Sequence, residues 1–267
     1  MIKLIWRCKS EMSHTIIDVT PDNIMETGIF CVNGTKFKEG IKRKELWYKQ
    51  RYAEGLRIKI AVNQDNIQTG MIEYVPGKYV WRTIHAENYT VIHCLQVSRS
   101  QTHQGYGSAL LNACIEDSQN ADGIALVTSS KPWVNDKKFF VKKGFKQISK
   151  AEPYYELLVK QFREAALPTF NVGWEERALI YGKGLIVFYS NQCPIIEDAL
   201  INLKGAAKEC NMEIHFCENN SAEKAQNAPF VYGTFGVLLN RQFLTHRVFD
   251  KDRYVGLLKA KQEHVRC

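Results

Sequence analysis

The stretch VIHCLQVSRSQTHQGYGSALLNACIED, residues 91–117, decides the fold class of this chain. Residues 90–97 form a near-continuous apolar run, which predicts a strand buried on both faces. Gly105 and Gly107 follow a short polar segment, and an apolar stripe at helical spacing begins directly behind them. The first N–H groups of a helix have no intrahelical partner, and with the helix dipole they form an anion site. The stretch therefore predicts a strand, an anion-binding loop and a helix.

The loop differs from the common nucleotide-binding loops. Leu110 follows where a dinucleotide loop would want its third glycine. No Lys-Ser/Thr pair follows the glycines, which argues against a nucleoside-triphosphate loop. A Gly-x-Gly pair before a helix is equally compatible with a tight turn that binds nothing. The loop alone leaves both interpretations open.

Composition narrows the class of protein. The chain has 267 residues, of which 45% are hydrophobic and 24% charged, as in ordinary globular proteins. No apolar run approaches the roughly 20 residues that span a bilayer, and the N-terminal run is too short for a signal peptide. The eight cysteines are scattered, with no pair at zinc-ribbon or dithiol spacing. We therefore expect a cytoplasmic protein with no membrane segment, no metal site and no disulfide framework.

The formal charge of +8 is unevenly distributed. Residues 166–267 hold 12 Lys and Arg against 11 Asp and Glu, so the first 165 residues carry a net charge of +7. The first part of the chain should therefore attract the anion. No basic stripe with interleaved aromatic residues is present, so we expect no nucleic-acid ligand.

The periodic segments divide the chain into two mixed α/β parts. The pattern breaks at 164–183, which we take as a linker between a domain at 1–163 and a smaller domain at 184–267. In the first domain we expect strands at 56–62, 68–74, 80–84, 90–97, 124–128 and 154–159, and helices at 22–26, 43–52, 107–119 and 136–143. In the second domain we expect a strand at 185–189, a helix at 195–209, a strand at 213–216, a hairpin of 235–239 with 243–248, and a final helix capped by Asp250.

Three segments of the first domain resemble the GNAT family of N-acetyltransferases. The opening stretch is similar to that family's central strand, pyrophosphate loop and helix, GIALVTSS to its next strand, and KKFFVKKGF to its late helix. The resemblance implies splayed central strands, acetyl-CoA as cofactor, and direct acetyl transfer to a small-molecule or peptide amine. It implies that backbone groups of the strand bind the pantetheine arm and that the loop binds the pyrophosphate. The cofactor-binding residues would be Leu95, Gln96, Val97, His103, Gln104, Gly105, Tyr106, Gly107 and Ser108.

Two positions depart from the family pattern. Thr102 stands where the family usually has Arg or Gln, and Phe140 stands where it usually has a tyrosine that protonates the departing thiolate. Phe140 cannot donate a proton, so another group or solvent must. Glu73, on a strand expected to face the cleft, is our candidate for the base. Weaker candidates are His85, Glu87, Tyr89 and His93, while Trp81 and Trp133 are expected to be packing residues.

The second domain resembles the thioredoxin fold in its βαβ–ββα order. Cys193 matches the attacking cysteine at a helix N-terminus, where a thiolate is favoured, and is our second candidate catalytic residue. Pro229 matches the cis-proline that faces this cysteine. Ile196 replaces the resolving cysteine, so the domain is either monothiol or a scaffold without redox activity.

The two domains together resemble the YoaP-type acetyltransferases, which carry a YoaP-like C-terminal domain. The expected function is acetyl-CoA-dependent N-acetylation of an unspecified amine. Two other classes stay open: a monothiol redox protein, and a non-catalytic CoA-binding interaction module. The oligomeric state does not follow from the sequence.

Overall fold

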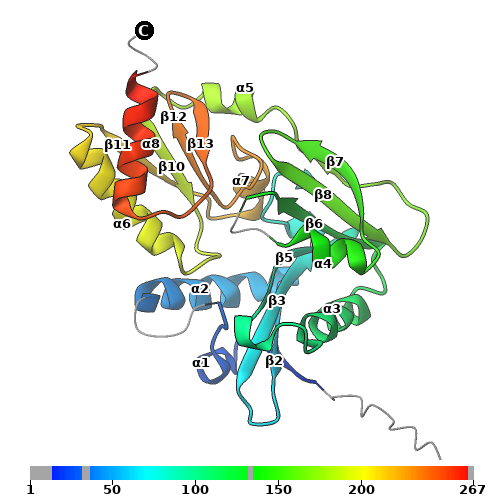
Figure 1. Ribbon diagram of the computed structural model, residues 1–267. Helices are drawn as coiled ribbons and strands as arrows, with labels where there is room; N and C mark the ends of the chain where they lie inside the picture. The colour runs from blue at the N-terminus through cyan, green and yellow to red at the C-terminus, as the bar shows by residue number, and fades with distance from the viewer. Residues whose placement is uncertain (1–13, 32–36, 132–134, 264–267) are drawn as a thin grey trace, which may run out of the picture.

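The structure, a computed structural model, describes residues 14–31, 37–131 and 135–263 (Figure 1). The strands are Thr15–Val19 (β1), Arg57–Val62 (β2), Gln68–Pro76 (β3), Ile84–His85 (β4), Tyr89–Val97 (β5), Gly123–Ser129 (β6), Lys146–Ala151 (β7), Tyr155–Gln161 (β8), Thr169–Phe170 (β9), Leu185–Tyr189 (β10), Ile214–Glu218 (β11), Phe235–Leu239 (β12) and Gln242–Thr245 (β13). The α-helices are Ile24–Thr27 (α1), Lys38–Arg51 (α2), Tyr106–Asp117 (α3), Lys137–Lys142 (α4), Trp174–Leu179 (α5), Ile196–Glu209 (α6), Ala222–Gln226 (α7) and Lys251–Glu263 (α8).

A seven-stranded sheet with the order β1-β2-β3-β5-β6-β8-β7 forms the frame of the first domain. Its one parallel pair is β5 with β6; the other neighbours are antiparallel. The two faces of the sheet bury separate cores. Leu110 and Leu111 of α3 and Phe140 of α4 pack on one face, and Trp47 and Tyr48 of α2 pack on the other. The mixed α/β class predicted for this domain is confirmed.

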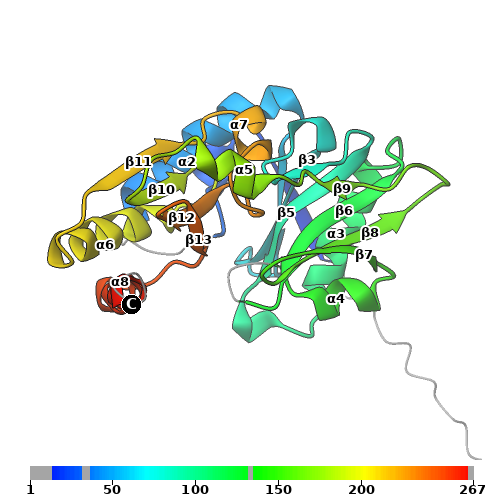
Figure 2. The same cartoon turned by 90° about the horizontal axis from the view of Figure 1, so that it is seen from above.

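The second domain has a four-stranded sheet with the order β11-β10-β12-β13. β10 and β11 are parallel and joined by α6, while β12 and β13 form a hairpin, as predicted. Asn240 and Arg241 form its turn with positive φ values of 50° and 69°. Asp250 caps α8 by accepting a hydrogen bond from the N–H of Arg253 at 2.8 Å. Seen from above, this domain lies beside the first, with α2 reaching beneath it (Figure 2).

Several expectations fail. Residues 80–84 do not form a strand; only Ile84–His85 is extended there, and it pairs with Thr169–Phe170 of β9. The predicted linker at 164–183 therefore contains β9 and α5 and packs against both domains. The strands β1 and β7 were not predicted. Among the described residues the cis peptide bond is Glu152–Pro153, so the bond before Pro229 is trans and the cis-proline prediction is wrong.

The two domains do not have separate cores. Ala222, Ala225 and Val231 of the second domain are buried in the same cluster as Trp47 and Trp81 of the first. This shared core fixes the second domain over the face of the large sheet that α3 and α4 leave uncovered. Within the described ranges, no helix combines the length and the apolar character that a membrane span needs.

Candidate functional site

The central strands β5 and β6 separate after a short contact. They pair only from Tyr89 to Val91 of β5, against Gly123 to Ala125 of β6. β5 then continues alone on this side to Val97. The predicted splay of the central strands is thus present. Asn135 lies beside the split, and its side chain accepts a hydrogen bond from the N–H of Leu95 at 2.9 Å.

Residues 103–108, which we call the anion loop, follow at the end of β5. Gly105 is the N-cap of α3 with φ +91°, and His103 also has a positive φ of 64°. The first helical hydrogen bonds come from the N–H groups of Ser108 and Ala109, both to the carbonyl of Gly105. The preceding N–H groups lie in the unpaired first turn of a 12-residue helix, where an anion is stabilised.

The anion loop lies next to α4. A Cβ added at Gly107 would lie 3.4 Å from Phe139 of α4, which is ordinary contact. The neighbouring helix is basic, since Lys137, Lys138 and Lys142 lie on it and Lys143 ends it. A hydrogen bond from outside the loop stabilises it, because Nε2 of His14 lies 2.7 Å from the carbonyl oxygen of Gln104. An open first turn beside a basic helix suits a pyrophosphate.

The two departures from the family pattern have structural counterparts. Phe140 is 1% exposed and packs edge-on against Phe139 and Phe145, so its position is filled by the core. Thr102 is exposed, and its hydroxyl donates to the carbonyl of Arg99 at 3.0 Å. Neither side chain offers a proton to a thiolate or a charge to a phosphate.

On the opposite face of the sheet, buried polar side chains of both domains meet in what we call the junction cluster. Its members are Lys44, Glu73, Arg82, His93 and Gln192. The ammonium of Lys44 donates to Oε2 of Glu73 and, at 2.7 Å, to the carbonyl of Gln192. Oε1 of Glu73 lies 3.2 Å from Nδ1 of His93. Glu73 thus lies on the predicted side of the sheet, but it is fully buried.

The hydrogen bonds define the charge state of the cluster. The N–H of Trp81 donates to Nε2 of His93 at 3.1 Å, so Nδ1 carries the ring proton and donates to Glu73. Burial lowers the pKa of His93 to about 4, so the ring is neutral near pH 7. Burial tends to raise the pKa of Glu73, but Lys44 and His93 together hold it well below its usual range. A saturated carboxylate with a low pKa does not suit a general base.

Arg82 and Gln192 connect the first domain to the second. Nη1 of Arg82 donates to Oε1 of Gln192 at 2.9 Å, and Nε2 of Gln192 donates to Oε1 of Glu73 at 2.6 Å. The guanidinium also lies 4.3 Å from the ring centroid of Tyr232. The remaining partners of its two terminal nitrogens are the carbonyls of Trp81 and His93, at 2.6 and 3.1 Å, and the hydroxyls of Thr234 and Tyr232, at 3.4 Å each.

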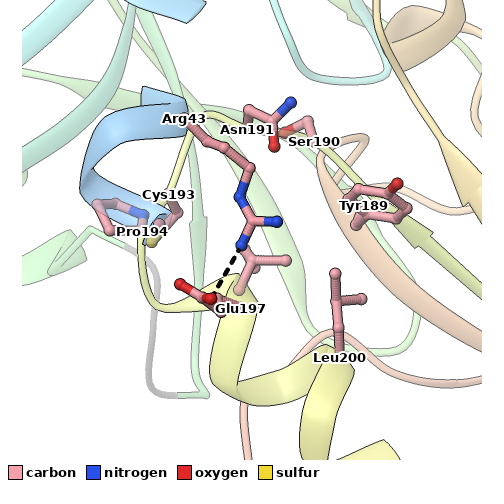
Figure 3. A pocket seen from close by; sticks show the side chains of 10 residues that line it. Arg43, Tyr189, Ser190, Asn191, Cys193, Pro194, Glu197 and Leu200 are labelled. Atoms are coloured by element: carbon pink, nitrogen blue, oxygen red, sulfur yellow. Dashed lines mark ion pairs between the residues drawn. The ribbon is translucent and has the colours of Figure 1, made fainter. Parts of the chain in front are cut away.

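Cys193 follows Gln192 and faces a shallow pocket between α2 and α6 (Figure 3). Arg43 and Glu197 close one side with an ion pair of 3.4 Å. Burial raises the pKa of the Cys193 thiol, against the lowering effects of the Ile195 backbone and Lys44. Desolvation of the sulfur thus opposes the thiolate that the helix N-terminus favours, and an activated Cys193 stays a prediction.

The other predicted candidates lie apart from this cluster. His85 and Glu87 are exposed, and the hydroxyl of Tyr89 accepts a hydrogen bond from Gln161 at 3.1 Å. Trp81 is fully buried and packs edge-on against Trp47, as expected of a packing residue. Trp133, Cys8 and Cys267 lie outside the described residues.

The sequence interpretation missed Lys44, Arg82, Asn135 and Gln192. Lys44 does carry a signal, because it falls on the apolar side of α2 with Trp47 and Tyr48. Gln192 carries no such signal in the sequence, because its partners Arg82 and Glu73 are 110 and 119 residues away.

Comparisons with known proteins fit this geometry. A model of the GNAT acetyltransferase family matches residues 32–145. YoaP of Bacillus subtilis (strain 168), described as an uncharacterized N-acetyltransferase, is 30% identical over 250 residues, which cover 91% of this chain and 98% of that protein.

Solved structures give weaker likenesses. PaiA N-acetyltransferase from Thermoplasma acidophilum, in complex with coenzyme A, has a TM-score of 0.41 and 17% identity over 57% of this chain and 100% of its own. A variant of SpeG spermidine N-acetyltransferase from Vibrio cholerae has a TM-score of 0.39 and 10% identity over 55% of this chain and 93% of its own. The relationship therefore rests on the sequence matches.

Proposed function

This chain belongs to the GNAT family of N-acetyltransferases, and on that premise we propose that it transfers the acetyl group of acetyl-CoA directly to an amine at the split between β5 and β6. The observation that carries the proposal is the split itself, because β5 runs six residues beyond its last pair with β6 and ends at the anion loop. Acetyl-CoA supplies the activated thioester.

The anion loop would hold the pyrophosphate through its unpaired first-turn N–H groups, assisted by the side chains of His103, Gln104 and Ser108. The N–H of Leu95 is already taken by Asn135. Backbone N–H groups two residues apart point to the same side of a strand. We therefore assign Val97, rather than Leu95, as the backbone donor to the pantetheine arm.

The chemical step needs an amine that has lost its proton and a thiolate that leaves. A thiolate is a stable leaving group near neutral pH, so solvent suffices where Phe140 cannot donate. Glu73 is better suited to bind the N–H of the amine than to remove its proton, because its pKa is held low. The acceptor-side groups therefore orient the amine, and we assign no side chain as base.

Titration calorimetry with acetyl-CoA tests the assignment of the loop. Gly107→Glu adds a charge and bulk beside the first-turn N–H groups, and losing two charge-assisted hydrogen bonds at about 1.5–3 kcal/mol each weakens binding at least about a hundredfold. Gly107→Ala is the matched control, since an added Cβ meets only ordinary contacts. Equal affinity of the parent and Gly107→Glu would show that acetyl-CoA binds elsewhere.

The two rival classes predict other results. A CoA-binding module would bind acetyl-CoA without releasing free thiol in the presence of any amine. A monothiol redox protein would not bind it and would depend on Cys193. The raised pKa of this thiol disfavours the redox class.

A further inference from the structure

Arg82 is an unusual cation for the interior of a protein. Its side chain is 3% exposed, and all of its hydrogen-bond partners are neutral carbonyls, hydroxyls or an amide. Among the described residues it forms no ion pair, whereas Lys44 is paired with Glu73. A buried charge without a counter-ion is costly unless something compensates for it. With Lys44 positive, Glu73 negative and His93 neutral, the junction cluster carries a net charge of +1 that a bound carboxylate would neutralise.

The Gln192 side chain occupies the position between this cation and Glu73. Its carboxamide presents an N–H to the carboxylate of Glu73 at 2.6 Å and an oxygen to the guanidinium of Arg82 at 2.9 Å. Because Glu73 can only accept and Arg82 can only donate, these contacts fix which end of the amide is nitrogen. The cluster therefore binds a nitrogen that carries hydrogens at Glu73 and an oxygen acceptor at Arg82.

We propose that Glu73 and Arg82 form the acceptor subsite of the acetyltransferase, and that it binds an α-amino acid, with the amine on Glu73 and the carboxylate on Arg82. The proposal rests on the proposed acetyl transfer and names its substrate class. An α-amino acid separates its nitrogen from its carboxylate oxygens by two carbons, against one in a carboxamide. It therefore spans the same two partners with a small displacement.

Charge favours this class over other amines. A free amine leaves Arg82 unneutralised, and so does a peptide N-terminus, whose neighbouring carbonyl is neutral. A neutral amine with a carboxylate brings the net charge of the cluster to zero. The subsite would thus select an acceptor that carries a carboxylate beside its amine. The ammonium proton leaves to solvent as the substrate binds. The amine nitrogen then forms the amide bond as the bond from the acetyl carbon to sulfur breaks, and the second nitrogen proton passes through solvent to the departing CoA thiolate.

In the structure the side chain of Gln192 occupies the subsite between Glu73 and Arg82, so the acceptor must displace it. Gln192 lies on the segment between β10 and α6, and the pocket of Figure 3 borders the same segment through Ser190, Asn191 and Cys193. Its backbone carbonyl, bound to Lys44, can stay in place when the side chain swings out. The second domain therefore contributes a built-in competitor of the acceptor.

The experiment compares acceptors in matched sets: each common α-amino acid, its amide and its decarboxylated amine, with thiol release as the readout. At least one α-amino acid should exceed its amide and amine in kcat/KM by about a hundredfold, the effect of one charge-assisted contact. An equal or higher kcat/KM for the amide and the amine, or turnover of no α-amino acid, overturns the proposal. Calorimetry with acetyl-CoA on the same protein stays positive in both cases, whereas its failure would reject the proposed function itself.

Two variants separate recognition from mere stability. Gln192→Ala removes the competitor and should lower KM for the amino acid about tenfold, with KM for acetyl-CoA unchanged. Asn191→Ala, the neighbouring control, should change neither. Arg82→Lys should raise KM for the amino acid at least tenfold and should narrow the ratio of kcat/KM between the amino acid and its amide. An unchanged or raised amino-acid KM in folded Gln192→Ala overturns the competitor role.

Discussion

The anion loop and the junction cluster lie on opposite sides of one sheet and are built on opposite principles. The loop is local: a strand, two glycines and the start of a helix supply every group within 20 residues, from Tyr89 of β5 to Ser108 of α3. The junction cluster gathers five side chains from α2, β3, β5, the segment after β3 and the second domain. The loop is largely exposed and offers backbone groups to a ligand. The cluster is buried and offers side chains.

This contrast has an energetic consequence. Exposed backbone donors cost little when a ligand is absent, because water replaces it. Buried charges must be paired or hydrogen-bonded at all times, so the cluster contributes to folding as well as to recognition. Mutations in the cluster should therefore affect stability strongly, and mutations at the loop should affect binding with little change in stability.

The largest effect is expected at Lys44. Lys44→Met leaves the Glu73 carboxylate buried without its cation and should lower the free energy of unfolding by about 3–5 kcal/mol, measured by urea denaturation. Lys42→Met in the same helix is the control, because its pair with Glu39 is exposed by 69% and 64% and contributes little to stability. Similar losses in both variants would remove the distinction between the two regions.

The second effect is a dependence of stability on pH. Burial lowers the pKa of His93 from 6.5 to about 4, so between these values the unfolded chain binds more protons than the folded one. Stability is then fully present above about pH 6.5 and falls by roughly 3 kcal/mol as the pH drops to about 4. The lowered pKa of Glu73 acts in the same direction below its usual value. Denaturation of the parent and of His93→Gln at several pH values measures how the free energy of unfolding depends on pH. An equal dependence in both proteins would exclude His93 as its source.

The third effect tests how closely the domains are docked. A Cβ added at Gly40 would lie 2.3 Å from the carbonyl oxygen of Pro194, so Gly40→Ala should push the second domain away at a cost of about 1–3 kcal/mol. Alkylation of Cys193, followed by mass spectrometry, should become faster. Gly107→Ala at the loop is the counterpart and should leave both quantities unchanged. Slow alkylation in Gly40→Ala would mean that the contact between the domains adjusts locally and does not separate.

The smallest effect lies on the loop side. Asp136 caps α4 by accepting a hydrogen bond from the N–H of Lys138 at 3.0 Å. Asp136→Ala should cost about 1 kcal/mol in thermal or urea denaturation, and Asp136→Asn, which also caps well, much less. A loss above that of Gly40→Ala would reverse the proposed ranking of the two sides.

The elements that could be predicted from the sequence are those whose structure depends on neighbouring residues. The strand Tyr89–Val97, the helix Tyr106–Asp117 and the glycines between them follow from periodicity and backbone geometry. The hairpin and the Asp250 cap follow for the same reason. By contrast, β1 and β7 are edge strands with mixed burial, and their pattern alone does not separate them from loops.

The junction cluster escaped prediction because its chemistry arises from docking. Glu73 was expected in an open cleft as a base, but the second domain covers it and Lys44 fixes its charge. Cys193 was expected to be an activated thiol, but the same docking desolvates it. Both differences in environment have one cause: solvent exposure and partners across more than 100 residues of chain are not visible in local patterns.

The shared core also constrains the order in which this chain can be made. Ala222, Ala225 and Val231 complete the packing around Trp47 and Trp81, and they leave the ribosome long after the first domain has been synthesised. At about 5–20 residues per second, the roughly 70 residues between the end of that domain and Val231 take about 3–14 seconds. During this interval the growing chain exposes an apolar face and the uncovered charges of Lys44, Glu73 and Arg82. A translating chain halted before Gln192 is therefore a natural client for chaperones.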